Sequence, residues 1–200
     1  RELVRHPIAI HDHTRMSLAV FERKTGKEFR FVPEGPLVAE GEWQAAIAHC
    51  AALDCHWLVA SGSLPRGVPA DFLVRLRDAL APRGVRLVVD SSGPALAAAI
   101  EAGGLFLAKP SRGEFEALTG QTFASTAEIE AAAARFVAGG KAEHLVVTLG
   151  HEGAVLAHRG HSVRGVDTSQ DVLRSLRLGN LPGLEPSLDA LAREGVSSGR

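Results

Sequence analysis

The feature that most constrains the fold is an alternation of apolar runs and helical patterns between Gly41 and Thr148. Mostly apolar runs without alternation are typical of buried strands, and they occupy 57–60, 85–89, 105–108 and 145–148. Segments with helical spacing flank them, at 41–53, 70–81, 94–102, 113–118 and 126–138. Strands alternating with helices predict an α/β fold, with a mostly parallel sheet and helices on both faces. The 200 residues are enough for one such domain.

Two hairpins are predicted outside this alternation. Segments 14–22 and 28–32 carry strand-forming residues on either side of a turn at 24–27, and Pro33, Gly35 and Pro36 end the second strand. This hairpin has one polar face, and its exposed Phe and Val residues need cover. We interpret it as a flap over a site or a subunit contact, with packing on its own domain as the alternative. A second hairpin is expected at 154–157 and 161–166.

Composition excludes several classes of partner. The net charge of −1 at pH 7 does not favour nucleic acid or an anionic membrane, and no apolar run has membrane-spanning length. Cys50 and Cys55 form no CxxC motif, so we expect a reducing, cytoplasmic location. No signal peptide is recognisable, and the chain does not begin with Met, so its natural N-terminus is expected upstream. His11 and His13 suggest a metal site, but no third ligand is evident.

Polar residues follow each predicted parallel strand. They are Ser61-Gly62-Ser63, Asp90, Lys109-Pro110-Ser111 and the loop 148–153. Because the carboxyl ends of parallel strands meet at one edge of a sheet, these groups are expected to face the same crevice. Hydroxyls, glycine backbone, an ammonium group and carboxylates suit a phosphate and the magnesium ion carried with it.

Four blocks resemble the ribokinase-like (PfkB) family of sugar kinases. They are SGSLPRGVP, VVDSSGPAL, KPSRGEFEALTG and VVTLGHEGAVL, and the hairpin TRMSLAVFERKTGKEFRFVPEGP resembles the phosphofructokinase branch that acts on fructose 6-phosphate. The resemblance implies a three-layer α/β/α sandwich with a small β-sheet lid at 14–36, a partial core at 37–166 and a divergent tail at 167–200. It also implies phosphoryl transfer from MgATP and a homodimer formed through the lid.

The resemblance also implies roles for individual positions. Residues that hold the phosphosugar correspond to Arg15 and Ser63. The ATP side of the site corresponds to Lys109, Ser111, Thr148, Gly150 and Gly153. The acidic residue that organises magnesium through water corresponds to Glu114.

The departures from the family pattern bear on activity. Ser111 stands where the family has Asn, and neither the GAGD motif with its catalytic base nor the GGKG-type opening occurs. We therefore expect a chain incomplete at both ends and assign no catalytic residue; Asp167 and Asp171 lie near the missing base but not in a Gly-rich turn. Three functions stay open: a fructose 6-phosphate kinase, a truncated non-catalytic relative, and a kinase for fructose 1-phosphate or tagatose 6-phosphate.

Simpler structural roles are open for several of these residues. Ser111 and Glu114 have the spacing of a capping box. Lys109 could be a solvated lysine at a strand end, and Thr148 could simply lead into a hairpin. Arg15 could form a surface pair with Glu22 or Glu28, which would stabilise the fold little.

Overall fold

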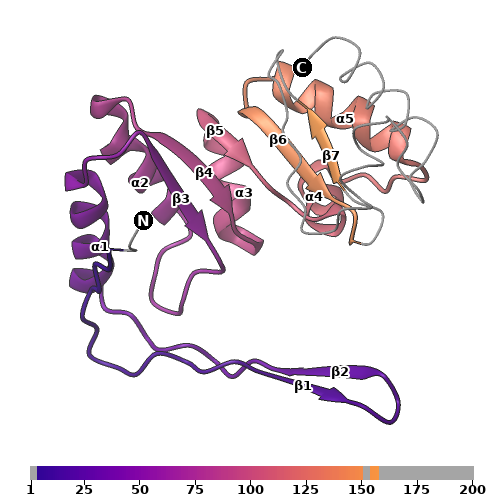
Figure 1. Cartoon of the computed structure of the whole chain (residues 1–200). Coiled ribbons are helices and arrows are strands. Elements are labelled where there is room, and N and C mark those ends of the chain that lie inside the picture. Colours follow the sequence, from indigo (N-terminus) through magenta and orange to yellow (C-terminus); the bar gives the residue numbers. More distant parts are fainter. Residues whose placement is uncertain (1–3, 151–153, 158–200) are drawn as a thin grey trace.

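The computed structural model describes residues 4–150 and 154–157 (Figure 1). The main sheet has the order β3-β4-β5-β6-β7. Its strands are β3 (Trp57–Ser61), β4 (Arg86–Asp90), β5 (Leu105–Ala108), β6 (Ala142–Thr148) and β7 (Ala154–Ala157). The first four are parallel, and β7 pairs antiparallel with β6. The predicted mostly parallel α/β sheet is confirmed.

Each parallel strand is joined to the next by helix. The helices are α1 (Glu40–Ala52), α2 (Phe72–Leu80), η1 (Ala81–Arg83), α3 (Gly93–Ala102), α4 (Arg112–Thr119) and α5 (Thr126–Ala138). Their bounds agree with the predicted segments to within two residues, and a 3₁₀ turn follows directly on the second. No helix in the described residues is long and apolar enough to cross a membrane.

The hydrophobic core lies on one face of the sheet. The strands are neighbours in both sequence and space, and crossovers between parallel strands are right-handed in nearly all proteins, which places α2 to α5 on the same side of the sheet. Their apolar residues form one cluster with alternate strand residues such as Leu87, Val89, Leu145 and Val147. Helices on both faces were expected; the part of the chain that the structure describes supplies one helical layer.

The prediction of a buried strand at Trp57 is wrong. Within the described residues β3 is an edge strand that pairs only with β4, and the side chains of Trp57 and Val59 are 47% and 63% exposed. The Trp57 ring instead packs edge-on against Phe106, at 4.5 Å between centroids, with the guanidinium of Arg86 over it. An apolar run cannot distinguish a central strand from an edge strand, because both pack one face on the core.

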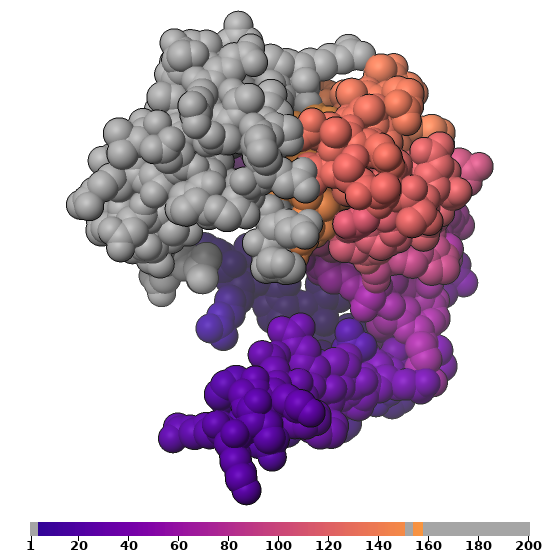
Figure 2. Space-filling model, turned by 90° about the vertical axis from the view of Figure 1, so that its right-hand side faces the viewer, coloured from indigo at the N-terminus to yellow at the C-terminus, as the bar shows by residue number. Residues whose placement is uncertain are grey.

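The N-terminal hairpin is formed by β1 (Leu18–Glu22) and β2 (Lys27–Phe31). It projects from the body of the molecule in Figure 1 and stands apart, in indigo and violet, at the bottom of Figure 2. Its register places Leu18 opposite Phe31 and Val20 opposite Phe29 on one face. The other face carries Arg30 and Glu28, as predicted, but also Phe21, which lies opposite Glu28, and all ten strand residues are exposed. The alternative that the hairpin packs on its own domain is therefore wrong.

Candidate functional site at the carboxyl edge of the sheet

The loops that follow the four parallel strands are joined to one another by hydrogen bonds. Gly62 N donates to Asp90 O at 2.8 Å, and Lys109 N donates to Val89 O at 2.9 Å. Thr148 N donates to Pro110 O at 3.0 Å, which extends the row to the end of β6. The predicted polar groups therefore line one continuous edge.

An ion pair lies in the middle of this edge. Lys109 Nζ is 3.0 Å from Asp90 Oδ1, and both side chains are roughly two-fifths exposed. Lys109 is thus more than a solvated strand-end lysine, since it faces a carboxylate from the neighbouring strand. Lys109 thus offers a cation for a phosphate group, and Asp90, in direct contact with it, offers a carboxylate for a magnesium ion.

Arg15 reaches the edge from the hairpin. Its Nη2 donates to Ser63 Oγ at 3.4 Å, although the two residues are 48 positions apart in sequence. The alternative of a surface pair with a hairpin carboxylate does not describe the geometry, because Glu28 pairs with Arg30 and Glu22 accepts from Thr25. The two residues matched to the phosphosugar side therefore lie together.

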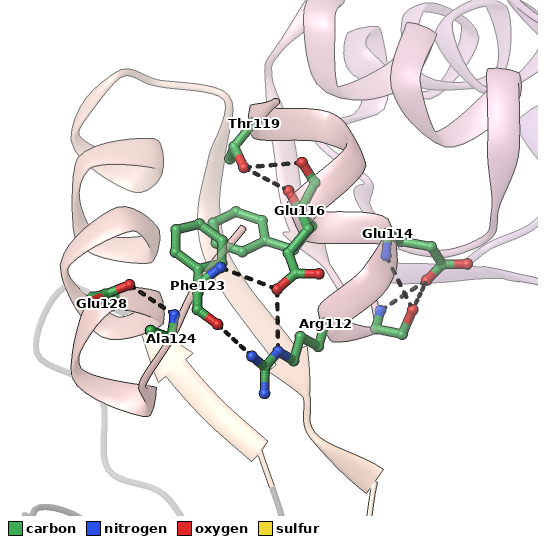
Figure 3. A network of polar contacts seen from close by, with 9 residues as sticks. Arg112, Glu114, Glu116, Thr119, Phe123, Ala124 and Glu128 are labelled. Atoms are coloured by element: carbon green, nitrogen blue, oxygen red, sulfur yellow. Dashed lines mark hydrogen bonds and ion pairs between the residues drawn. The ribbon is translucent and has the colours of Figure 1, made fainter. Parts of the chain in front are cut away.

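Ser111 and Glu114 form the capping box that begins α4. Glu114 Oε2 accepts from both Ser111 N and Ser111 Oγ at 2.8 Å (Figure 3). The structural role is confirmed. It is compatible with a metal role because both cap contacts are to Oε2, which leaves Oε1 available. Among the described residues no group of three or more His, Cys, Asp or Glu side chains could hold a metal ion. The few carboxylates at this edge fit a magnesium ion that is bound mainly by phosphate oxygens and water.

Thr148 and Gly150 lie at the last loop of the row. Thr148 pairs with Ala154 in the β6–β7 hairpin and also bridges to Ser111, so it is both a hairpin residue and an edge residue. Gly150 has φ +67°, and a Cβ there would meet open space. Its backbone is accessible, as approach of an anion requires. Gly153, Asp167, Asp171, the strand expected at 161–166 and the tail 167–200 lie outside the described residues.

Two features of the site were missed at the sequence level. Ser91 is buried, and its Oγ donates to Gly62 O at 2.9 Å, which fixes the loop that carries Ser63. Asp90 was placed at the edge but was given no individual role, and its pairing with Lys109 depends on two strands being neighbours. The repeated hydroxyls in Asp90-Ser91-Ser92 were the available signal for the first feature.

Comparison with known proteins identifies the family. Residues 4–172 match the profile of the pfkB family carbohydrate kinases. The chain belongs to this family. Within it, the ATP-dependent 6-phosphofructokinase isozyme 2 of Escherichia coli (strain K12) is 37% identical over 145 residues, or 72% of this chain and 47% of that protein. The isozyme of the same name from Mycobacterium tuberculosis (strain ATCC 25618 / H37Rv) is 33% identical over an alignment of 219 positions, gaps included, which covers 94% of this chain and 64% of that protein.

Solved structures of family members agree with the fold. The crystal structure of phosphofructokinase-2 from Escherichia coli in complex with fructose-6-phosphate has a TM-score of 0.69 at 29% identity, covering 92% of this chain and 59% of that one. The tetrameric inhibited form of the same enzyme has a TM-score of 0.72 at 31% identity, covering 96% and 66%. The ribokinase-like α/β fold class is confirmed. The chain spans between about half and two thirds of the length of these family members.

Proposed function

We propose that the carboxyl edge of the sheet serves ATP-dependent phosphoryl transfer to a phosphorylated ketohexose, with fructose 6-phosphate as acceptor and fructose 1,6-bisphosphate as product. The observation that carries the proposal is the continuous row of loops from Ser63 through Asp90 and Lys109 to Thr148. The two relatives named 6-phosphofructokinase support the choice of acceptor.

The two ends of the row suit the two substrates. Arg15 and Ser63 offer a guanidinium and a hydroxyl to the phosphate and hydroxyls of the sugar. At the other end we assign Lys109, Ser111, Thr148, Gly150 and Gly153 to ATP. Phosphoryl transfer depends mostly on positioning and on neutralising charge. The row of loops would position the two substrates along one edge, and the Lys109 ammonium group would neutralise charge on the ATP phosphates.

We assign the magnesium ion of MgATP to the neighbourhood of Glu114; Asp90, which is paired with Lys109, is a second carboxylate on the same edge. When bound, the ion would neutralise charge on the transferring phosphoryl group. Glu114 keeps one oxygen on Ser111 through the capping box, so it would act on the ion through water.

No general base is assigned, because the GAGD motif does not occur in the sequence. A general base typically contributes about 10²–10⁴-fold to rate. We therefore propose that this polypeptide binds nucleotide and sugar weakly and turns over slowly. We also propose a cytoplasmic location, because free thiols such as Cys50 and Cys55 persist there.

We further propose a homodimer formed through the hairpin. One face of β1–β2 exposes Leu18, Val20, Phe29 and Phe31, and exposed apolar patches on otherwise charged proteins mark contact surfaces. A second copy would cover this face while leaving the polar face in water.

The test combines turnover and binding. ADP release is followed in a coupled assay with MgATP and each of fructose 6-phosphate, fructose 1-phosphate and tagatose 6-phosphate, and binding of each ligand is measured by calorimetry. Binding of fructose 6-phosphate in preference to the other sugars, with slow turnover, is expected. The fructose 1-phosphate arm matters because the 1-phosphofructokinase of Xanthomonas campestris pv. campestris is 31% identical over 164 residues. Turnover typical of enzymes, about 1–10³ per second, would refute the slow-turnover proposal, and no binding of any sugar or ATP would refute the function.

A further inference from the structure

The loop that follows β3 contacts both legs of the hairpin. Its Ser63 accepts a hydrogen bond from Arg15 on the outgoing leg. On the returning leg, Leu37 bridges to Arg66, and Val38 N donates to Arg66 O at 2.8 Å. The loop 63–67 therefore contacts both chain segments at the base of the hairpin.

Gly67 makes the second contact possible. Its φ is +85°, a conformation that favours glycine, and a Cβ at this position would collide with the carbonyl oxygen of Val38. Val38 is buried, with 8% of its surface exposed, so the returning leg cannot move aside without disturbing the core. The close approach of these two backbones is thus specific to glycine.

The Arg66 side chain adds polar contacts to the returning leg. Its Nη1 lies 3.2 Å from Glu34 Oε2, and its Nε donates to Gly35 O at 3.4 Å. Both charged side chains are largely exposed, so these contacts orient the leg more than they stabilise the fold.

We infer that Gly67 and Arg66 act as a clamp: through them, the loop 63–67 holds the base of the hairpin in place. Arg15 is thereby kept in contact with Ser63. Gly67 and Arg66 are positioning residues, since neither is assigned to either substrate. A sugar phosphate bound between Arg15 and Ser63 would join the outgoing leg more firmly to the loop, while the clamp holds the returning leg. The effect of these two residues on sugar binding rests on the proposed function.

The first test uses Gly67→Ala, with Gly84→Ala as the matched control. Gly84 also has positive φ, at +66°, but a Cβ there meets nothing within 4 Å, so the control carries the backbone strain without the collision. Hydrogen exchange of the Val38 amide, which donates to Arg66 O, is measured in the absence of ligand. We expect exchange in Gly67→Ala to be faster by about tenfold or more, and unchanged in the control. Equal exchange in the two variants would overturn the clamp.

The second measurement compares the effect of Gly67→Ala on fructose 6-phosphate affinity with its effect on ATP affinity. By calorimetry, Gly67→Ala should weaken fructose 6-phosphate binding by about tenfold and leave ATP binding unchanged, because the clamp touches only the sugar end of the row. A parallel loss of both affinities would indicate general damage and overturn the positioning role. If the wild-type protein binds no fructose 6-phosphate, the proposed acceptor fails, while the exchange measurement still decides whether the clamp exists.

Arg66→Ala keeps the proposal testable if Gly67→Ala does not fold. Its control is Arg30→Ala, which removes an exposed ion pair with Glu28 at the far part of the hairpin. Faster exchange of the Val38 amide and weaker fructose 6-phosphate binding are expected for Arg66→Ala alone, with partial rescue by Arg66→Lys, which restores the charge facing Glu34. Equal behaviour of Arg66→Ala and Arg30→Ala would contradict the inference.

Discussion

At the scale of single residues, Gly150 is where backbone conformation and proposed ATP binding coincide. Gly150→Val places a β-branched side chain at φ +67° and in the open space beside the edge. We expect ATP affinity to fall by at least about tenfold, or 1.4 kcal/mol, measured by calorimetry with MgATP. Gly84→Val, which also sits at positive φ but beyond η1, is the control for strain. Unchanged affinity in Gly150→Val would remove this loop from the ATP side.

Ser111 combines a structural and a proposed functional role that substitution can separate. Ser111→Ala removes the hydroxyl that caps α4 and should cost about 1 kcal/mol in the free energy of unfolding, whereas Ser111→Asn should cost little because Asn is an equally good N-cap. Urea unfolding measures both. Ser125→Ala, at the N-cap of α5, is the control: it should cost a similar amount and leave MgATP binding intact. If Ser125→Ala also weakened MgATP binding, the loss of stability alone would explain any weakening of MgATP binding in Ser111→Ala.

At the scale of elements, the carboxylate of Glu116 ties the connection between α4 and α5 back to α4. Glu116 accepts from Phe123 N and from Arg112 Nε, both at 3.2 Å, and Arg112 also donates to Phe123 O (Figure 3). The Phe123 N–H first, and the Arg112 guanidinium second, hold the pKa of Glu116 below its ordinary value of 4.5. The network closes the chain back onto α4 before α5 begins.

This lowered pKa predicts a pH dependence of stability. Because the folded state favours the charged carboxylate, the contribution is complete above the ordinary pKa and is lost as pH falls through the lower, folded value. Urea unfolding at pH 7 and pH 4 should therefore show a smaller decrease for Glu116→Gln than for the wild type. Arg112→Gln should keep most of the decrease, since the backbone donor is the larger cause. An identical decrease in wild type and Glu116→Gln would show that the contact does not form in solution.

The helices and strands were largely predictable from the sequence, but which of them lie side by side was not. The helical spacing and the caps at Ser111 and Ser125 located α4 and α5 correctly, because these signals are local. The exposure of Trp57 could not be predicted, since it depends on which strand lies beside β3. Likewise, the polar edge followed from the rule for parallel strands, but the Lys109–Asp90 and Arg15–Ser63 contacts depend on side chains from distant segments.

At the scale of the whole molecule, the projecting hairpin carries a group of large hydrophobic side chains that are exposed in the single chain. The opposed residues Val20 and Phe29 lie on its apolar face, whereas Phe21 lies on the other face, opposite Glu28. Phe21 is also more exposed than Phe29, at 63% against 46%, so simple exposure and facing make different predictions. If the apolar face is the subunit contact, removing Phe29 matters more than removing Phe21.

We therefore expect Phe29→Ser to shift the protein from dimer to monomer by about tenfold or more in the dissociation constant, because truncating a buried interface aromatic typically costs more than 1 kcal/mol. Sedimentation velocity over a range of concentrations measures this shift. Phe21→Ser is the matched control and should remain dimeric, since the substitution is the same on the same hairpin. A wild-type protein that stays monomeric, or equal dissociation of the two variants, would contradict a dimer formed through this face. A shift confined to Phe29→Ser would instead identify Leu18, Val20, Phe29 and Phe31 as one contact surface.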